Sequence, residues 1–177
     1  GPSRDAERDP RPEEEVRCAP RRRSGAPHEL VAVVPGARSG ETERRIESLP
    51  KLIEEAGALA MVGAKERGIR LKFALDPRVE LVLADKVQIQ QVLLNLLRNA
   101  VEAMEASARR ELVISVASGA DSMVTISVAD TGSGISPEMA PQLFQPFVTN
   151  KRHGMGVGLS ICRSIVEGHG GQIWVES

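Results

Sequence analysis

The sequence predicts an α/β (α+β) fold, a two-layer sandwich in which a mixed, mostly antiparallel sheet of about five strands packs on three helices. Two observations predict it. Short runs alternate apolar and polar residues, as half-buried strands do, and between them lie longer segments with apolar residues at helical spacing. The 177 residues are 41% hydrophobic and 27% charged, which suits one folded domain with an attached tail.

Residues 1–42 are expected to be a tag, linker or disordered tail. Prolines recur in them, arginines form a triplet at 21–23, and large apolar residues are few, so the segment buries too little surface to offset its ordering entropy. The opening Gly-Pro-Ser resembles the scar of a cleaved tag and suggests a piece of a larger protein. Residues 43–177 are expected to form the domain.

The first elements of the domain are a helix and two short strands. The helix is expected to begin at Ser48, a capping residue followed by Pro50 in the first turn, and to end near Gly68. Residues 69–75 then alternate with the period of a strand, and after a turn residues 79–83 do the same.

A second helix is expected from Asp85 to about Ala106. Spaced at about 100° per residue, its large apolar side chains fall on one side and its amides and charges on the other. Two more alternating runs, 112–116 and 124–128, predict a hairpin. A stretch punctuated by glycine and proline leads to a third helix from Gly156 to about Gly168, and residues 173–175 begin a last strand.

Charge and cysteine content exclude several classes of function. Lys and Arg number 23 against 24 Asp and Glu, so a net charge of -1 gives no general field for nucleic acid or an anionic membrane. Cys18 and Cys162 lack the spacing of a disulfide framework or zinc site. No apolar run approaches the ~18 residues of a membrane span. We expect a cytoplasmic fragment that contacts neither nucleic acid nor membrane.

The polar side of the second helix carries Asn95, Arg98, Asn99 and Glu102. Asparagine is a poor helix former, about 0.7 kcal/mol worse than alanine, so its repetition one turn apart calls for a reason. Amide oxygens, a guanidinium and a carboxylate facing one way could coordinate a metal or an anion. An ordinary solvated helix face is the alternative.

The stretch VADTGSGI places Asp130 at a strand end, followed by Gly132 and Gly134. These glycines allow the backbone to approach a flat ligand, and the carboxylate can accept a hydrogen bond from an exocyclic amine such as adenine N6. The alternatives are a plain Asp-Thr-Gly turn and an aspartic protease. A protease needs two such carboxylates, so a single copy would require a homodimer.

In HGMGVGLSI, Gly154, Gly156 and Gly158 lead directly into the third helix, whose free N–H groups could cradle a phosphate. The stretch lacks the Gly-Lys-Ser/Thr of a P-loop, and Leu159 stands at the third glycine of a dinucleotide fingerprint. A glycine-rich hinge is the alternative. In order along the chain, the three stretches together predict a nucleotide site.

At these residues the chain resembles the catalytic ATP-binding domain of two-component sensor histidine kinases, of the Bergerat-fold superfamily that also contains gyrase B and Hsp90. NLLRNAVEAM resembles the family's N box, DTGSGI its first glycine box, LFQPFVTNK its Phe-containing lid box, and GMGVGLSI its second glycine box. The wording is most similar to the FixL-type kinases, which sense oxygen. The resemblance covers residues 43–177 and implies a mobile ATP lid.

The resemblance implies roles for individual residues. Asn99 would ligate Mg²⁺, Asn95 and Arg98 would lie against the phosphates, Asp130 would select adenine, and Lys151 would reach the γ-phosphate. The implied catalytic residues are Asn95, Asn99 and Lys151. Further implied contacts to ATP come from Glu102, Gly132, Gly134, Ile135, Phe147, Thr149, Gly154, Met155, Gly156, Val157, Gly158 and Leu159.

The implied reaction transfers the γ-phosphoryl of Mg-ATP to a histidine on a separate dimerisation domain of the parent protein, for relay to a response regulator. In ATP-hydrolysing relatives a glutamate at the position of Asn95 activates water, whereas an amide cannot take a proton. Without the dimerisation domain the fragment would be inactive in transfer. The alternative is an ATP-binding regulatory module that transfers nothing.

Three departures from the family pattern stand out. His28-Glu29-Leu30 begins like the acceptor motif, but Pro35 lies seven residues after the histidine instead of five. Asn150 replaces the threonine most common in the lid motif. The chain stops after the strand of Trp174, so the family's last strand is missing and an exposed sheet edge is expected.

Overall fold

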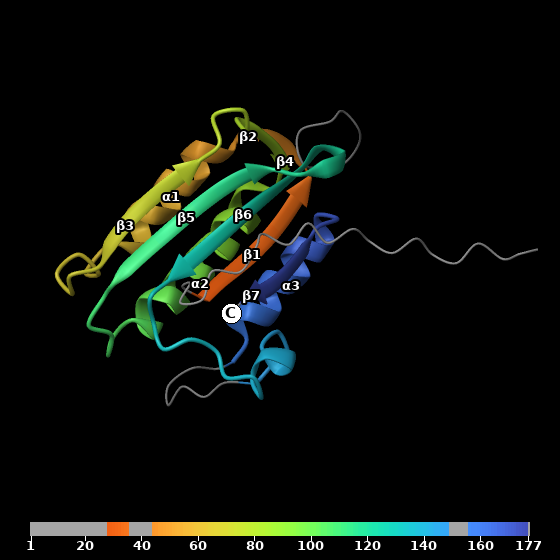
Figure 1. Ribbon diagram of the computed structural model, residues 1–177. Coiled ribbons are helices and arrows are strands. Elements are labelled where there is room, and N and C mark those ends of the chain that lie inside the picture. Colours follow the sequence, from red (N-terminus) through yellow and green to blue (C-terminus); the bar gives the residue numbers. More distant parts are fainter. Residues whose placement is uncertain (1–27, 36–43, 149–155, 177) are drawn as a thin grey trace, which may run out of the picture.

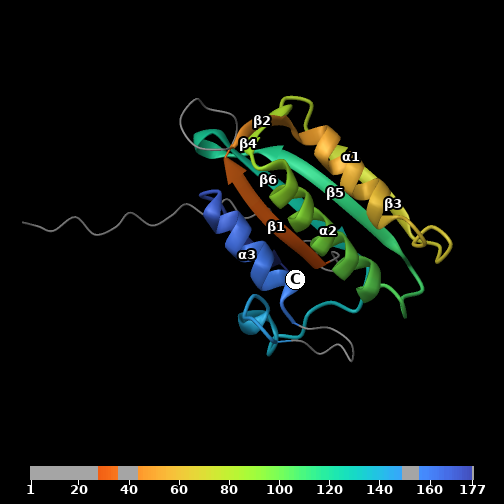
Figure 2. The same ribbon diagram turned by 180° about the vertical axis from the view of Figure 1, so that it is seen from behind.

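The computed structural model describes residues 28–35, 44–148 and 156–176. A five-stranded sheet is covered on one face by three α-helices, and a two-stranded sheet lies at one end (Figures 1 and 2). The order of the larger sheet is β3-β5-β6-β1-β7; β3 and β5 are parallel and every other pair is antiparallel. The predicted two-layer fold with a mixed, mostly antiparallel sheet is confirmed.

The helices are α1 (Leu49–Ala60), α2 (Lys86–Ala103) and α3 (Gly158–Gly168). The larger sheet contains β1 (His28–Pro35), β3 (Arg70–Leu75), β5 (Glu111–Ser118), β6 (Met123–Asp130) and β7 (Gln172–Glu176). The smaller sheet pairs β2 (Arg45–Ser48) with β4 (Leu81–Ala84). Short 3₁₀ turns lie at Ala120–Ser122 and Ala140–Gln142.

Helix α2 begins after Asp85, where it was predicted to start, and Asp85 caps it. The carboxylate of Asp85 accepts hydrogen bonds from the backbone N–H groups of Val87 and Gln88 at 2.9 and 3.1 Å. Helix α1, by contrast, ends at Ala60, well before the predicted Gly68, because Gly63 adopts a left-handed φ of +74° that a helix cannot continue through.

The core lies between the sheet and the helices, and α2 is its centre. The predicted apolar side of α2 is buried, with Leu96 and Leu97 fully inaccessible and α1 and α3 packed on either side. The polar side emerges as predicted, since Asn95 and Asn99 are half-buried while Arg98 is exposed. None of the helices in the described residues has the length and hydropathy of a bilayer-spanning segment.

Strand β1 falls inside the segment predicted to be a tail, and for residues 28–35 that prediction is wrong. The strand lies between β6 and β7 and pairs antiparallel with both (Figure 1). Its side chains continue the core, because Ala32 and Val34 are 3% and 2% exposed. The strand of Trp174, β7, pairs with β1 on one side and, among the described residues, is the last strand of the sheet, where the exposed edge was expected.

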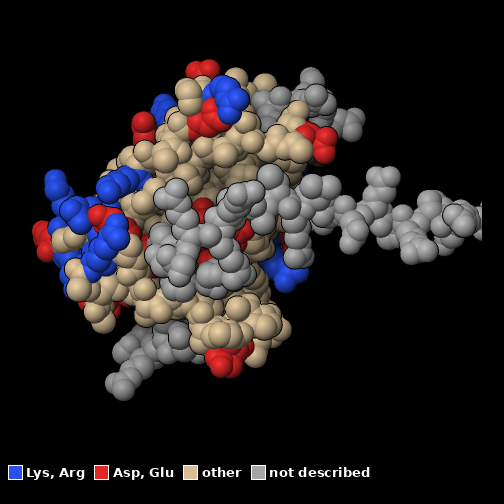
Figure 3. All heavy atoms as spheres, in the orientation of Figure 1, with Lys and Arg blue, Asp and Glu red and all other residues tan. Residues whose placement is uncertain are grey.

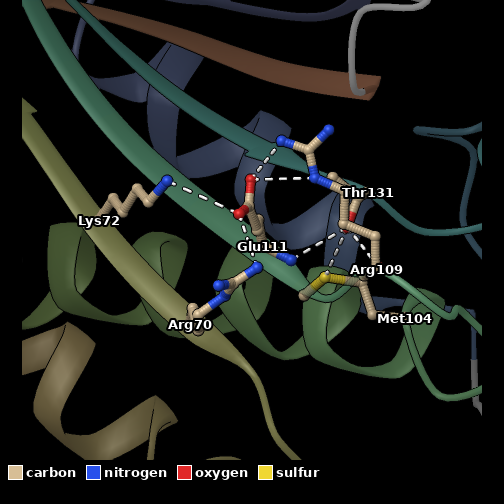
Figure 4. Close-up of polar contacts among 6 residues, drawn as sticks. All are labelled: Arg70, Lys72, Met104, Arg109, Glu111 and Thr131. Atoms are coloured by element: carbon tan, nitrogen blue, oxygen red, sulfur yellow. Dashed lines mark hydrogen bonds and ion pairs between the residues drawn. The ribbon is translucent and has the colours of Figure 1, made fainter.

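A charge cluster fixes the start of β5. Glu111 accepts from Arg70 at 2.9 Å and from Arg109 at 3.1 and 2.5 Å, with the ammonium of Lys72 at 3.7 Å. Figure 3 shows Lys and Arg gathered at the edge of the sheet formed by β3, beside β5. Figure 4 shows the hydrogen bonds and ion pairs of Glu111. The hydrogen bonds from Arg109, with the charges of Lys72 and Arg70, hold the pKa of Glu111 below its usual value. Because the cations are largely exposed, the ion pairs add little stability.

The hydroxyl of Thr131 ties the residue after Asp130 to the start of β5. It accepts from the backbone N–H of Glu111 at 3.0 Å and donates to the carbonyl of Arg109 at 2.6 Å (Figure 4). We expect Thr131→Val to lower the free energy of unfolding by about 1–2 kcal/mol, because both backbone groups lose their partner. Urea denaturation measures this loss. Thr131→Ser keeps the hydroxyl and serves as the control; equal destabilisation by both variants would contradict the prediction.

Candidate functional site

The loop that follows β6 lies against the C-terminal turn of α2. Asp130 is 9% exposed, and its Oδ1 accepts from the backbone N–H of Gly132 at 2.8 Å. The N–H of Ser133 donates to the carbonyl of Ala103 at 3.1 Å, one helical turn beyond Asn99. Two of the predicted stretches, the Asp130 loop and the polar stripe of α2, are therefore neighbours.

Gly132 is required by this close approach. A Cβ at this position would lie 2.6 Å from the Ala103 carbonyl oxygen and 2.7 Å from Oδ1 of Asp130, both too short for any real contact. Gly134 adopts a φ of +78°, so it too occupies a conformation that favours glycine. The two glycines of this motif hold backbone positions that larger residues would disturb.

The start of α3 contacts α2 at Asn95, which lies about two turns before Ala103. The amide nitrogen of Asn95 lies 3.5 Å from the carbonyl oxygen of Gly158, at the long limit of a hydrogen bond. A Cβ on Gly158 would lie 3.9 Å from the Asn95 side chain, which is ordinary contact. In Figures 1 and 2 the end of β6, the end of α2 and the start of α3 lie at the same end of the domain.

The two ends of the predicted lid are joined at its base. The N–H of Phe147 donates to the carbonyl of Gly156 at 2.9 Å. Gly156 has a φ of +67°, and a Cβ there would lie 2.8 Å from the carbonyl carbon of Phe147. Phe147 itself has a φ of +65° and is 80% exposed, so it does not plug the core.

The predicted site residues divide into three groups. Asn95, Asn99, Asp130, Gly132 and Gly158 lie along α2 or in loops that contact it. The second group is more exposed or lies at the margin of the site. Arg98 and Glu102 are exposed on α2, and Gly134 and Ile135 follow Gly132. Phe147 and Gly156 form the lid base, Val157 caps α3, and Leu159 is half-buried in the first turn of α3. Thr149, Lys151, Gly154 and Met155, with Asn150, lie outside the described residues.

This arrangement can bind a flat, anionic ligand. A buried carboxylate supplies an acceptor for an amine, α2 supplies amide oxygens, and the first N–H groups of α3 favour an anion. Among the described residues, no group of three His, Cys, Asp or Glu side chains could hold a metal, so a metal here would rely on amide oxygen and on the ligand itself. A cavity of about 290 Å³ beside Met104 is lined by none of the predicted site residues.

Sequence reasoning missed the residues that support the site. Thr131 was taken only as part of the Asp-Thr-Gly motif, although its hydroxyl holds two backbone groups. Cys162, which the helical spacing places on the inner side of the third helix, is fully buried as expected, but its contact is not predicted: its Sγ lies 3.9 Å from the Val92 carbonyl oxygen. A strand-end threonine and a small apolar residue on the inner side of α3 were the available signals, and both are too common to identify a role.

Comparison with known proteins identifies the family to which this fold belongs. Residues 84–177 match the family described as Histidine kinase-, DNA gyrase B-, and HSP90-like ATPase, which is more than half of the chain. The chain belongs to this family. Within it, the chain corresponds to the catalytic ATP-binding domain of a FixL-like sensor histidine kinase.

The relatives support the same assignment. Sensor protein FixL of Bradyrhizobium diazoefficiens is 61% identical over 138 residues, which cover 78% of this chain and 27% of FixL. The catalytic domain of histidine kinase ThkA is 30% identical, with a TM-score of 0.63 over 76% of this chain and 94% of that one. ThkA in complex with response regulator TrrA is 28% identical, with a TM-score of 0.61 over 75% and 41%. The ATPase domain thus spans about a quarter of FixL.

Burial of Cys162 in this ATPase domain makes stability depend on pH. Burial raises the pKa of its thiol to about 11, whereas an unfolded thiol titrates near 8.5. Above pH 8.5 the unfolded state therefore binds fewer protons, so the free energy of unfolding falls as pH rises, by about 2 kcal/mol at pH 10. Urea midpoints at pH 7.5 and 10 measure this. Cys162→Ala should lack that part of the slope, and an unchanged slope would refute the assignment.

Proposed function

We propose that this domain binds Mg-ATP against α2 and presents the γ-phosphoryl to a histidine of another domain of its parent protein. The carrying observation is that the Asp130 loop and the start of α3 both contact α2, at Ala103 and at Asn95. The family description names an ATPase, and the FixL and ThkA relatives are sensor kinases. Relay to a response regulator is supported by the complex of ThkA with TrrA.

Each residue has a role that its position supports. The Asp130 carboxylate accepts from the exocyclic amine of adenine and, having no proton to donate, disfavours the carbonyl of guanine. Asn99 offers its amide oxygen to Mg²⁺, which prefers oxygen ligands and is held largely by the phosphates. Bound Mg²⁺ neutralises charge on the phosphates. Asn95 and Arg98 orient the phosphates. For Lys151, which lies outside the described residues, the contact to the γ-phosphate rests on the family resemblance alone.

The chemistry favours transfer over hydrolysis. A glutamate at position 95 could take a proton from water, but the amide of Asn95 cannot. Catalysis then consists of positioning and charge neutralisation, which is what phosphoryl transfer chiefly requires. The γ-phosphoryl is preserved until a histidine nucleophile attacks it. In this proposal the acceptor histidine belongs to another domain of the parent protein.

His28 is not favoured as that acceptor. It is the first residue of β1, opposite Asp130 in the β1–β6 register, with its backbone committed to the sheet. An acceptor histidine must travel to the γ-phosphoryl, whereas the backbone of His28 is paired with β6 at the start of β1.

Titration with a fluorescent ATP analogue tests the proposal. We expect Mg²⁺-dependent binding that ATP displaces and GTP does not. Asn99→Ala should weaken the Mg²⁺-dependent binding at least about ten-fold, or 1.4 kcal/mol, because an amide ligand is lost. Gln91→Ala, an exposed change on the same helix, is the control. Absence of adenine-selective binding by the unmodified chain would refute the nucleotide function.

A second assay separates transfer from binding alone. A version of the parent that includes the dimerisation domain should acquire label from γ-³²P-ATP that is acid-labile and base-stable, as phosphohistidine is. The Asn99→Ala version should remain unlabelled. Binding without any labelling of the longer version would favour the alternative, an ATP-binding regulatory module.

A further inference from the structure

His169 lies buried at the junction of α2 and α3. It follows the last residue of α3 and is 2% exposed. Its Nε2 accepts from the backbone N–H of Asp85 at 3.1 Å, and its Nδ1 lies 2.8 Å from the carbonyl oxygen of Ile165. An N–H can only donate and a carbonyl can only accept, so the ring is neutral and carries its hydrogen on Nδ1.

The two hydrogen bonds of His169 are not equivalent. The Ile165 carbonyl also accepts from the backbone N–H of His169 at 3.0 Å, so the ring bond is a second contact to an acceptor that already has a partner. The N–H of Asp85 belongs to the capping residue of α2, just before the helix begins. The bond from Asp85 to Nε2 therefore connects the start of α2 to the end of α3.

This bond lies at one end of a row of polar contacts between α2 and α3. Further along are Sγ of Cys162 to the carbonyl oxygen of Val92 at 3.9 Å, and Asn95 to Gly158 at 3.5 Å. The order of the contacts along α2 is reversed along α3, so the helices run antiparallel, side by side, as Figure 2 shows. His169 holds one end of the pair, and the predicted nucleotide site lies at the other.

We propose that His169 is a positioning residue for the nucleotide site. A helix of this length moves as a rigid rod, so a shift at the start of α2 relative to the end of α3 carries through to Asn95 and Gly158. The ring fixes that relative position without touching the ligand. The proposal rests on the proposed ATP-binding function and adds to it a determinant outside the four family motifs.

Three substitutions at His169 separate positioning from stability. In Gln, Oε1 lies as many bonds from Cγ as Nε2 does in His, so Gln keeps an acceptor for Asp85 and loses the donor to Ile165. In Asn, Nδ2 takes the place of Nδ1, so the donor is kept and the acceptor is lost. Phe keeps neither. Arg44→Met is the matched control, because Arg44 donates to the carbonyl of Gly168, so its loss removes a hydrogen bond at the end of α3 other than the one from Asp85.

Two measurements on each variant decide the question. One is the affinity of the 1–177 chain for a trinitrophenyl ATP analogue with Mg²⁺, and the other is the unfolding temperature. We expect His169→Asn and His169→Phe to lose at least ten-fold in affinity, His169→Gln to stay within three-fold, and Arg44→Met to lose unfolding temperature without affinity. Should Phe fail to fold, the Asn and Gln pair still decides.

The inference is overturned if Asn and Gln bind equally well, or if affinity follows unfolding temperature through all variants including Arg44→Met. Failure of the unmodified chain to bind the analogue is a different result, since it refutes the proposed function itself. Normal binding by the unmodified chain with unchanged binding by His169→Asn refutes only the positioning role.

Discussion

Replacing Gly171 with alanine is expected to displace β1 from the sheet and lower the free energy of unfolding by about 3 kcal/mol or more. The new Cβ would overlap the carbonyl oxygen of Val33 and lie 2.9 Å from its carbonyl carbon. Because Val33 belongs to a strand paired on both sides, its carbonyl cannot move without breaking pairs to β6 or β7. Relief of this overlap therefore requires either β1 or β7 to leave the sheet.

Hydrogen exchange and urea denaturation test this prediction together. Amides of β1, such as those of Val31 and Val33, should lose protection in Gly171→Ala before those of β5. Gly168→Ala is the matched control, because a Cβ at Gly168 meets nothing within 4 Å and Gly168, the last residue of α3, lies three residues before Gly171. Full β1 protection in Gly171→Ala would contradict the predicted displacement. A lack of β1 protection in the unmodified chain would show that residues 28–35 do not occupy this position in solution.

Replacing Gly132 with alanine is expected to abolish most nucleotide binding, with affinity for the ATP analogue falling at least about ten-fold and stability by about 1–3 kcal/mol. The added methyl group would collide with the Ala103 carbonyl and with the Asp130 carboxylate at once. The carboxylate is the predicted adenine acceptor, and Ala103 lies one turn after Asn99. To relieve this collision, the Asp130 loop and the end of α2, which carry the two halves of the proposed site, must move apart.

A glycine at the opposite end of β6 provides the comparison. A Cβ on Gly119 would lie 3.3 Å from the Met123 carbonyl oxygen, so Gly119→Ala also crowds a backbone carbonyl but does so in the hairpin, away from α2. It should lower the unfolding temperature and leave the affinity unchanged. Equal affinities for Gly132→Ala and the unmodified chain would remove the Asp130 loop from the site.

The sequence was sufficient to predict the elements whose signal is local. The alternation in β5 and β6, the start of α2 at Asp85 and the one-sided burial of Leu96 and Leu97 all follow from residue type and period, and the structure confirms them. Two motif glycines, Gly134 and Gly156, also act locally, since their positive φ is a property of the backbone itself. For the same reason the family resemblance could be recognised before any coordinates were known.

The prediction for strand β1 failed because it rested on the composition of residues 1–42 taken as a whole. Leu30 to Val34 is an unbroken apolar run, which is typical of a strand buried on both faces. Its surroundings, rich in proline and arginine, led to the prediction of a tail for the whole segment. Nothing in the run itself indicates which strands it will lie between, because pairing partners distant in sequence leave no local mark.

The sequence by itself determined most of the secondary structure, the buried side of α2 and the chemical types available for a nucleotide site. Only the tertiary structure decided that residues 28–35 fill the space between β6 and β7, that Gly132 and Gly171 must lack a side chain, and that His169 joins α2 to α3. The physical reason is that local patterns depend on a residue's own preferences. Close backbone approach and hydrogen bonds between distant segments depend on where packing brings the chain together.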